Sequence, residues 1–174
     1  MKRKLVGILV FAFASVMTFC LVGCGTALDR EVTIQNMTIS VPSGWAEDSD
    51  EYSLGTTSYG SYSYVSDDME SSISIHYSND YTTPEEDLAS MERSYASDPI
   101  NAYDWYVNDL GQEAIESSVV SKYEYGYKAK DNDGNEWEGK TQIAYIMTPS
   151  LNFDIAVIGD EVKLDDVLKT MKIA

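Results

Sequence analysis

The sequence predicts an α+β domain, built mainly from antiparallel β-sheet, with one helix in the middle of the chain and one at the C-terminus. Three observations lead to this fold class. Apolar and polar residues alternate in several short segments between residues 31 and 158, as in half-buried strands. Residues 83–86 carry a helix-capping signature, and apolar residues at helical spacing close the chain from Leu164 to Met171. Strands on either side of one helix, followed by a final helix, form an α+β sandwich.

The first 23 residues have the layout of a secretory signal. A basic start, Met1 to Lys4, precedes an apolar run without any charged side chain up to Gly23. The run ends in Leu21-Val22-Gly23-Cys24, which resembles the lipobox of bacterial prolipoproteins, with an aliphatic residue three positions before the cysteine and a small residue directly before it. We expect residues 1–23 to be removed and Cys24 to receive a lipid, which would hold the protein on the membrane.

Two other interpretations of this segment stay open. The apolar run is long enough to remain as a membrane-spanning helix, since about 20 residues suffice. An ordinary signal peptidase could also cut nearby and leave Cys24 unmodified. All three interpretations place the residues after Cys24 outside the cytoplasm. We favour a lipid-anchored protein on the extracytoplasmic face of the cell membrane, because the sequence turns polar directly after the cysteine.

Removal of 23 of the 174 residues leaves a mature chain of 151 residues, the size of one domain. Residues 24–30 form a short tether, at most about 25 Å long, and residues 31–174 form the domain. Cys20 lies in the apolar run and is lost with it. Cys24 is then the only thiol of the mature protein, which excludes an intramolecular disulfide.

The mature chain is strongly acidic. It keeps nine of the 12 basic residues and all 29 acidic ones, which gives a net charge of −20. A field of this sign repels nucleic acid and anionic lipid head groups and favours cations or basic partners. It also keeps an exported protein soluble. We expect a monomer that does not bind nucleic acid.

Strand signals follow one another along the domain. Asn36 separates two alternating runs, which predicts a hairpin, and Trp45 is expected to fold back onto the core after Pro42-Ser43-Gly44. Asp131-Asn132-Asp133-Gly134 is a second hairpin signal. The expected strands are two between Glu31 and Val41, two or three between Tyr52 and Tyr77 of which Ser72 to Tyr77 is the clearest, and then Lys122 to Lys128, Glu136 to Met147 and Leu151 to Ile158.

The mid-chain helix has a defined start. Thr83 can cap it, Pro84 suits the first helical position and Glu86 completes a capping box. The helix should end near Ser97, before Pro99. The segment from 102 to 120 is not assigned to an element, although its last apolar residues suggest a return to strand. The terminal helix is predicted over Leu164 to Ile173, with acidic residues early and lysines late, as the helix dipole favours.

The segment Thr38-Ile39-Ser40-Val41-Pro42-Ser43-Gly44-Trp45, together with the mid-chain helix, the long meander and the last helix, resembles the PsbP-like α/β/α sandwich group of exported proteins. The resemblance covers Glu31 to Ile173. It implies a sandwich fold and accessory or binding roles without catalysis, and it transfers no site residues.

Little in the sequence indicates catalysis or a metal. His76 is the only histidine, no Gly-x-Ser-x-Gly elbow is present, and we expect a solvated strand histidine. One histidine and a lipidated Cys24 exclude a zinc site with several His or Cys ligands. The run Asp131 to Glu136 has its glycine in the fourth position, whereas a calcium loop of the EF-hand type needs it in the sixth. We expect no metal and no cofactor, while paired carboxylates for hydrolysis stay open.

Tyrosine is frequent, with 13 residues in the chain, and it alternates in two segments. The rings of each segment lie on one face of a strand. The two ladders are Tyr62 and Tyr64, and Tyr123, Tyr125 and Tyr127. On a shared sheet face they would form an aromatic platform for a peptide or a sugar. Otherwise the rings pack beneath the helices with their hydroxyls at the rim, which we favour.

These features favour a non-catalytic binding or accessory domain for a protein, a glycan or another envelope component. The alternatives are an extracytoplasmic hydrolase that uses carboxylates and a structural surface spacer. Acidic residues converging in a deep pocket would favour the enzyme. A shallow aromatic face would favour binding, and a surface without a sizeable apolar patch would favour the spacer.

Overall fold

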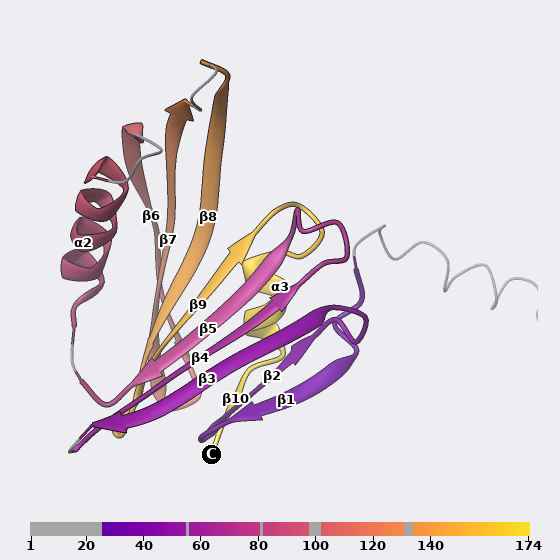
Figure 1. The fold of residues 1–174 in the computed structure, drawn as a ribbon. Helices are drawn as coiled ribbons and strands as arrows, with labels where there is room; N and C mark the ends of the chain where they lie inside the picture. Colours follow the sequence, from indigo (N-terminus) through magenta and orange to yellow (C-terminus); the bar gives the residue numbers. More distant parts are fainter. Residues whose placement is uncertain (1–25, 55, 81, 98–101, 131–133) are drawn as a thin grey trace, which may run out of the picture.

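Figure 1 shows the fold in a computed structural model, which describes residues 26–54, 56–80, 82–97, 102–130 and 134–174. Cys24 and the predicted signal segment lie outside the described residues. The strands are β1 (Arg30–Ile34), β2 (Met37–Val41), β3 (Ala46–Leu54), β4 (Thr57–Val65), β5 (Ser72–Ser78), β6 (Tyr103–Ile115), β7 (Ser118–Lys130), β8 (Glu136–Met147), β9 (Asn152–Ile158) and β10 (Lys172–Ile173). The helices are α2 (Pro84–Ser97) and α3 (Leu164–Lys169). No helix among these residues is long and apolar enough to cross a membrane.

A seven-stranded antiparallel sheet forms the centre of the molecule, in the order β3-β4-β5-β9-β8-β7-β6. A small sheet, β1-β2-β10, is separate from it. In Figure 1, α2 lies on one side of the large sheet beside β6, β7 and β8, while α3 and the small sheet lie on the other side. The α+β class with mainly antiparallel sheet, one mid-chain helix and one C-terminal helix is therefore confirmed.

The N-terminal hairpin forms where the alternation predicts it. β1 pairs with β2 from Arg30↔Val41 to Ile34↔Met37, and Gln35 takes a positive φ of 56° at the turn. The apolar residues of β2 are buried against the large sheet. Trp45 is only 8% exposed, and its backbone N–H donates to the Pro42 carbonyl at 3.4 Å, so the expected return of the indole onto the core is confirmed.

The capping box of α2 is present. The backbone N–H of Glu86 donates to the Thr83 hydroxyl, and the N–H of Thr83 donates to the Glu86 carboxylate, both at 3.2 Å. These two bonds satisfy N–H groups that the first helical turn leaves unpaired. The helix buries Leu88 against the sheet.

Two hydrophobic clusters lie on opposite faces of the large sheet. The larger one contains Ile73, Ile75 and Tyr77 of β5 together with residues of β1, β2 and α3. The smaller one lies under α2 and contains Leu88, Tyr123, Tyr125, Ile143 and Tyr145. The larger cluster extends to Val120 of β7 and to Ala144 and Ile146 of β8, so the middle of the sheet is covered on both faces.

Two element predictions need correction, and one unassigned segment forms a strand. The first strand of the large sheet was expected from Tyr52 onward, but β3 begins at Ala46. The acidic stretch up to Glu51 pairs with β4 although it lacks the residues typical of strands. Residues 103–115 form the edge strand β6, with register shifts at two places. The terminal helix ends at Lys169, since Lys172 and Ile173 pair with β2 as β10.

Candidate functional site

The two tyrosine ladders lie on opposite faces of the large sheet. Tyr62 pairs with Ile75, and the same row continues through Ile155 and Ala144 to Lys122. Neighbouring residues of a strand point to opposite faces, so Tyr123 points away from the face of Tyr62. A single platform made of both ladders is therefore excluded by the register.

The first ladder belongs to the larger core. Tyr64 is 1% exposed, and the Arg30 guanidinium carbon lies 5.2 Å from its ring centroid. Tyr62 is half-buried, and its hydroxyl donates to the Glu51 carboxylate. Burial and this carboxylate raise the pKa of Tyr62 above its ordinary value. Tyr64 is therefore a core residue, whereas Tyr62 directs its hydroxyl to an exposed carboxylate.

The second ladder packs under α2. Tyr123 and Tyr125 are buried, and the Tyr123 hydroxyl donates to Glu85 in the first turn of the helix at 3.3 Å. Burial raises the pKa of Tyr125 to about 12. The neighbouring Tyr145 donates to Asp87 at 2.7 Å. These rings pack between α2 and the sheet, as expected if the ladder lies beneath a helix. The ligand-binding role of the five ladder tyrosines stays a prediction.

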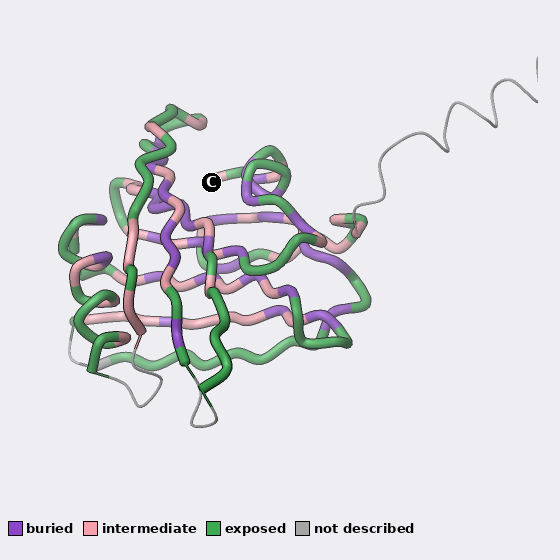
Figure 2. The backbone as a smooth tube through the Cα atoms, turned by 90° about the horizontal axis from the view of Figure 1, so that it is seen from above, coloured by how far each residue is buried: buried purple, intermediate pink, exposed green. Residues whose placement is uncertain are grey.

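A groove lies where β8 continues past the end of β9. β9 pairs with β8 only from Met147↔Asn152 to Thr141↔Ile158. The residues of β8 beyond this point, Glu136 to Lys140, pair with β7 on one side, and no described strand pairs with their other side. We call this segment the β8 overhang. It stands out from the rest of the sheet in Figure 1. Figure 2 draws the outer part of the hairpin formed by β7 and β8 largely in green, the colour of exposed residues.

The chain leaves β8 at this point because of Gly159. Its φ is +85°, a backbone conformation that residues with a side chain rarely adopt. A Cβ atom there would lie 2.2 Å from the Ser71 hydroxyl and 2.5 Å from the Glu70 carbonyl oxygen. Only glycine fits this close approach. The chain then turns toward α3, where Val162 and Leu164 are buried, and the overhang remains uncovered.

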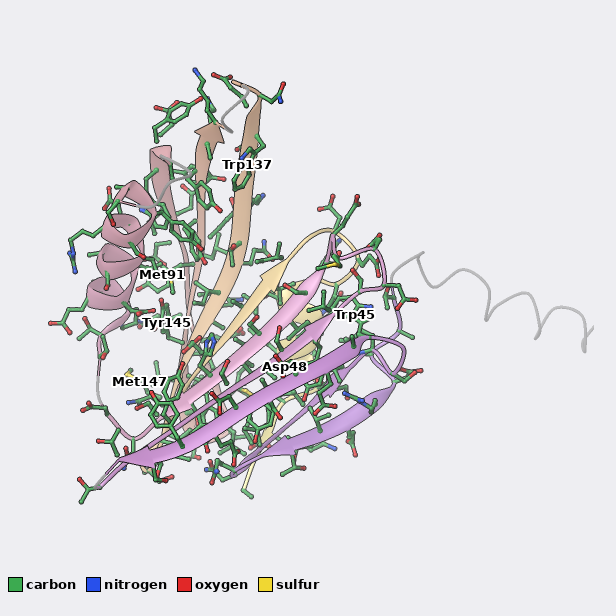
Figure 3. All side chains as sticks on the ribbon, viewed as in Figure 1. Trp45, Asp48, Met91, Trp137, Tyr145 and Met147 are labelled. Carbon is green, nitrogen blue, oxygen red and sulfur yellow. The ribbon has the colours of Figure 1, made fainter. Side chains whose placement is uncertain are left out.

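The groove encloses about 1050 Å³ and contains side chains from both faces of β8. Some of the most exposed large apolar side chains among the described residues line it: Met69 is 82% exposed, Ile158 44% and Trp137 42%. Figure 3 shows Trp137 on the outer part of β8, far from Tyr145 at the other end of the strand. Exposed apolar side chains gathered in a concave surface are typical of a binding site.

One wall of the groove is aromatic. Tyr127 lies across from Gly139, and a Cβ atom on Gly139 would come within 2.6 Å of its ring. The Tyr127 ring meets Trp137 edge to face, with centroids 5.5 Å apart, and stacks on Tyr95 of α2 at 4.7 Å. Tyr127 is thus the only ladder tyrosine among the groove residues described. Because these rings hold one another, Trp137 has a supported position despite its exposure.

The other wall is charged. Its acidic residues outnumber its basic ones, with Glu70, Glu138, Asp160 and Asp165 against Lys140 and Lys163. Lys140 forms an ion pair with Glu124 at 2.8 Å, which raises the pKa of the lysine. Asp165 accepts a hydrogen bond from Lys122 at 3.0 Å. The groove therefore combines an apolar wall with an acidic one.

His76 is not simply a solvated histidine. Its Nδ1 lies 2.6 Å from Oδ2 of Asp154, the residue opposite it on β9. This hydrogen bond raises the pKa of His76 against the effect of burial. Ser61 is opposite His76 on β4, but no hydrogen bond among the described residues joins the two. None of the three residues lines the groove.

No group of three or more His, Cys, Asp or Glu among the described residues is placed to hold a metal ion. Residues 131–133 of the expected polar turn lie outside that set. The groove itself was missed by sequence reasoning, although a signal existed. The expected strand Glu136 to Met147 is longer than its partner Leu151 to Ile158, and this mismatch predicts an overhang.

No protein-family model matches the chain, and no curated protein matches its sequence. The fold is similar to the solution structure of cyanobacterial PsbP (CyanoP) from Synechocystis sp. PCC 6803, with a TM-score of 0.57 and 10% sequence identity. The match covers 89% of this chain and 99% of that chain. At this identity the similarity concerns the fold alone. The PsbP-like fold that the sequence resemblance implied is therefore confirmed.

Proposed function

We propose that the protein is a lipid-anchored extracytoplasmic lipoprotein whose domain binds a protein partner through the groove, without catalysis. The anchor part of the proposal rests on the basic start, the apolar run and the lipobox that ends at Cys24. Two or more acyl chains on that cysteine would make the attachment stable, whereas one gives only marginal binding.

The groove beside the β8 overhang is the observation that supports binding. Met69, Trp137 and Ile158 expose apolar surface there. The edge of the β8 overhang that faces away from β7 has no described partner strand. Solvent-exposed apolar side chains and free edges are costly features in a monomer, and proteins usually bury or shield them. A partner that covers this surface accounts for both features. The groove also favours binding over the spacer alternative, which predicts no such patch.

The anchor is tested with Cys24→Ser. We expect the variant to lose incorporation of labelled fatty acid and to accumulate as unprocessed precursor, because the cysteine carries the lipid that precedes cleavage. Metabolic labelling with palmitate measures the lipid incorporation, and mass spectrometry of the N-terminus measures the processing. A wild-type mature protein with an unmodified Cys24 would exclude the anchor and leave the groove proposal unaffected.

The binding site is tested with a photo-crosslinking amino acid at Glu138 in intact cells. We expect a crosslinked product of defined mass from this position. The same amino acid at Glu92, an exposed residue of α2, is the matched control. Products that are equal at both positions, or absent at Glu138, would show that the groove is not the partner site.

A further inference from the structure

The β8 overhang offers backbone hydrogen-bonding groups along one side of the groove. In an antiparallel pair, alternate residues of a strand direct both N–H and C=O toward the same neighbour. Two or three residues among Glu136 to Lys140 therefore direct these groups away from β7, where no described strand receives them. The segment is about 17 Å long at the usual rise of a strand. This length suits a short extended peptide.

The side chains around the overhang define what such a peptide would carry. Trp137, Tyr127 and Ile158 lie toward one face of the sheet. Glu138 lies toward the other face, as does Asp165 of α3, which accepts a hydrogen bond from Lys122 there. Side chains of an added strand alternate between the two faces. One set would contact the apolar wall and the other the acidic wall. The pattern that fits is an alternation of apolar and basic residues.

The charge of the whole domain points to the same kind of partner. The mature chain has nine basic and 29 acidic residues. Such a field favours the approach of a basic segment, and it opposes the pairing of two copies of this chain along their free edges. Glu138 lies within the overhang itself, where a basic side chain on the added strand would be its neighbour.

We propose that the groove binds an extended, basic segment of a partner protein, which adds to the large sheet as a strand along Glu136 to Lys140. The inference rests on the proposed binding function and specifies its ligand. Main-chain hydrogen bonds to the overhang would provide affinity, and the two walls would select the side-chain pattern. The segment would occupy the line along which β9 would continue if Gly159 did not turn the chain away.

The test uses the lipid-free domain and three fluorescent peptides. The first alternates lysine and valine, the second alternates glutamate and valine, and the third is the lysine peptide with its backbone amides methylated. We expect only the first to bind by fluorescence anisotropy. The Glu138→Lys variant should weaken binding about tenfold, a change of about 1.4 kcal/mol. Glu92→Lys makes the same charge change on α2 and should leave binding unchanged.

Amide hydrogen exchange locates the added strand. We expect the amides among Glu136 to Lys140 that point away from β7 to exchange quickly in the free domain and to become protected with the lysine peptide. Equal binding of the methylated peptide, or protection elsewhere, would overturn strand addition. So would no binding, or a dimer of the free domain that pairs along the overhang, seen by sedimentation. These results leave the crosslink at Glu138 intact, so failure of the strand and failure of the proposed function are distinguishable.

Discussion

The two ends of β8 belong to one strand and have opposite surroundings. From Thr141 to Met147 the strand pairs with β7 and β9 on both edges, and its side chains contact both hydrophobic clusters. From Glu136 to Lys140 it pairs with β7 alone, and most of its side chains are exposed. The sequence is strand-like in both parts. The two parts differ because β9 ends at Ile158, opposite Thr141, and does not extend along the rest of β8.

This comparison separates stability from recognition along one element. The paired end contributes buried apolar area, which is the main source of folding free energy. The overhang contributes little to the core and presents side chains and backbone groups to a partner. Substitutions at the two ends should therefore have different effects.

The largest expected effect is at the paired end. Ile146 is 0% exposed, and Ile146→Ala removes a buried side chain and leaves a cavity, so we expect a loss of about 2–5 kcal/mol in the free energy of unfolding. Urea denaturation measures it. Ile158→Ala is the control, because the same substitution at a side chain that is 44% exposed should cost about 1 kcal/mol or less. Equal losses at both positions would contradict the comparison.

Gly159 decides where the two ends of β8 separate. Gly159→Ala forces a side chain into a left-handed conformation and against the backbone of Glu70, so we expect a loss of about 2 kcal/mol. Thermal unfolding measures it. Gly44→Ala is the matched control, since no atom lies within 4 Å of its added Cβ. An unaltered melting temperature for Gly159→Ala would show that this turn does not constrain the end of β9.

Trp137→Ala is expected to separate the two properties. The side chain is 42% exposed, so the free energy of unfolding should fall by only about 1 kcal/mol or less. The crosslink from Glu138 should nevertheless be lost, because the apolar wall is removed. Urea denaturation and the crosslinking yield measure the two quantities. A large loss of stability would instead assign Trp137 to the core.

The smallest expected effect concerns His76, which joins β5 to β9 within the fully paired part of the sheet. Its pKa in the folded protein is above the ordinary value of 6.5, so the ion pair with Asp154 contributes fully below that pH. The contribution is lost as the pH rises through the folded-state pKa. We expect the free energy of unfolding of the wild type to exceed that of His76→Gln by about 0.5 kcal/mol at pH ~5.5 and by less at pH ~9. The difference is small because solvent screens this partly exposed pair. Denaturation of both proteins at each pH measures it. A difference that grows with pH would contradict the pairing.

Local signals predicted much of the fold. The hairpin around Asn36, the capping box at Thr83 and the buried Trp45 each depend on residues close together in sequence. The acidic strand β3 and the short strand β10 were missed, because each is a strand only through pairing with a distant segment. Propensity in such edge strands is overridden by their neighbours.

The candidate site was harder to predict than the fold. The tyrosine ladders were visible in the sequence, but the face that each occupies depends on the register of five neighbouring strands. The groove unites Met69, Trp137 and Ile158, which lie far apart in the chain. No spacing in the sequence connects them.

By itself, the sequence determined the α+β class, the acidic charge, the main strands and the start of the mid-chain helix, since these follow from composition, alternation and capping over short distances. It also predicts the anchor at Cys24. The tertiary structure alone decided that the ladders face opposite ways, that Gly159 ends β9 early and that the β8 overhang stays open. The physical reason is that register and strand termination are set by long-range pairing and close packing.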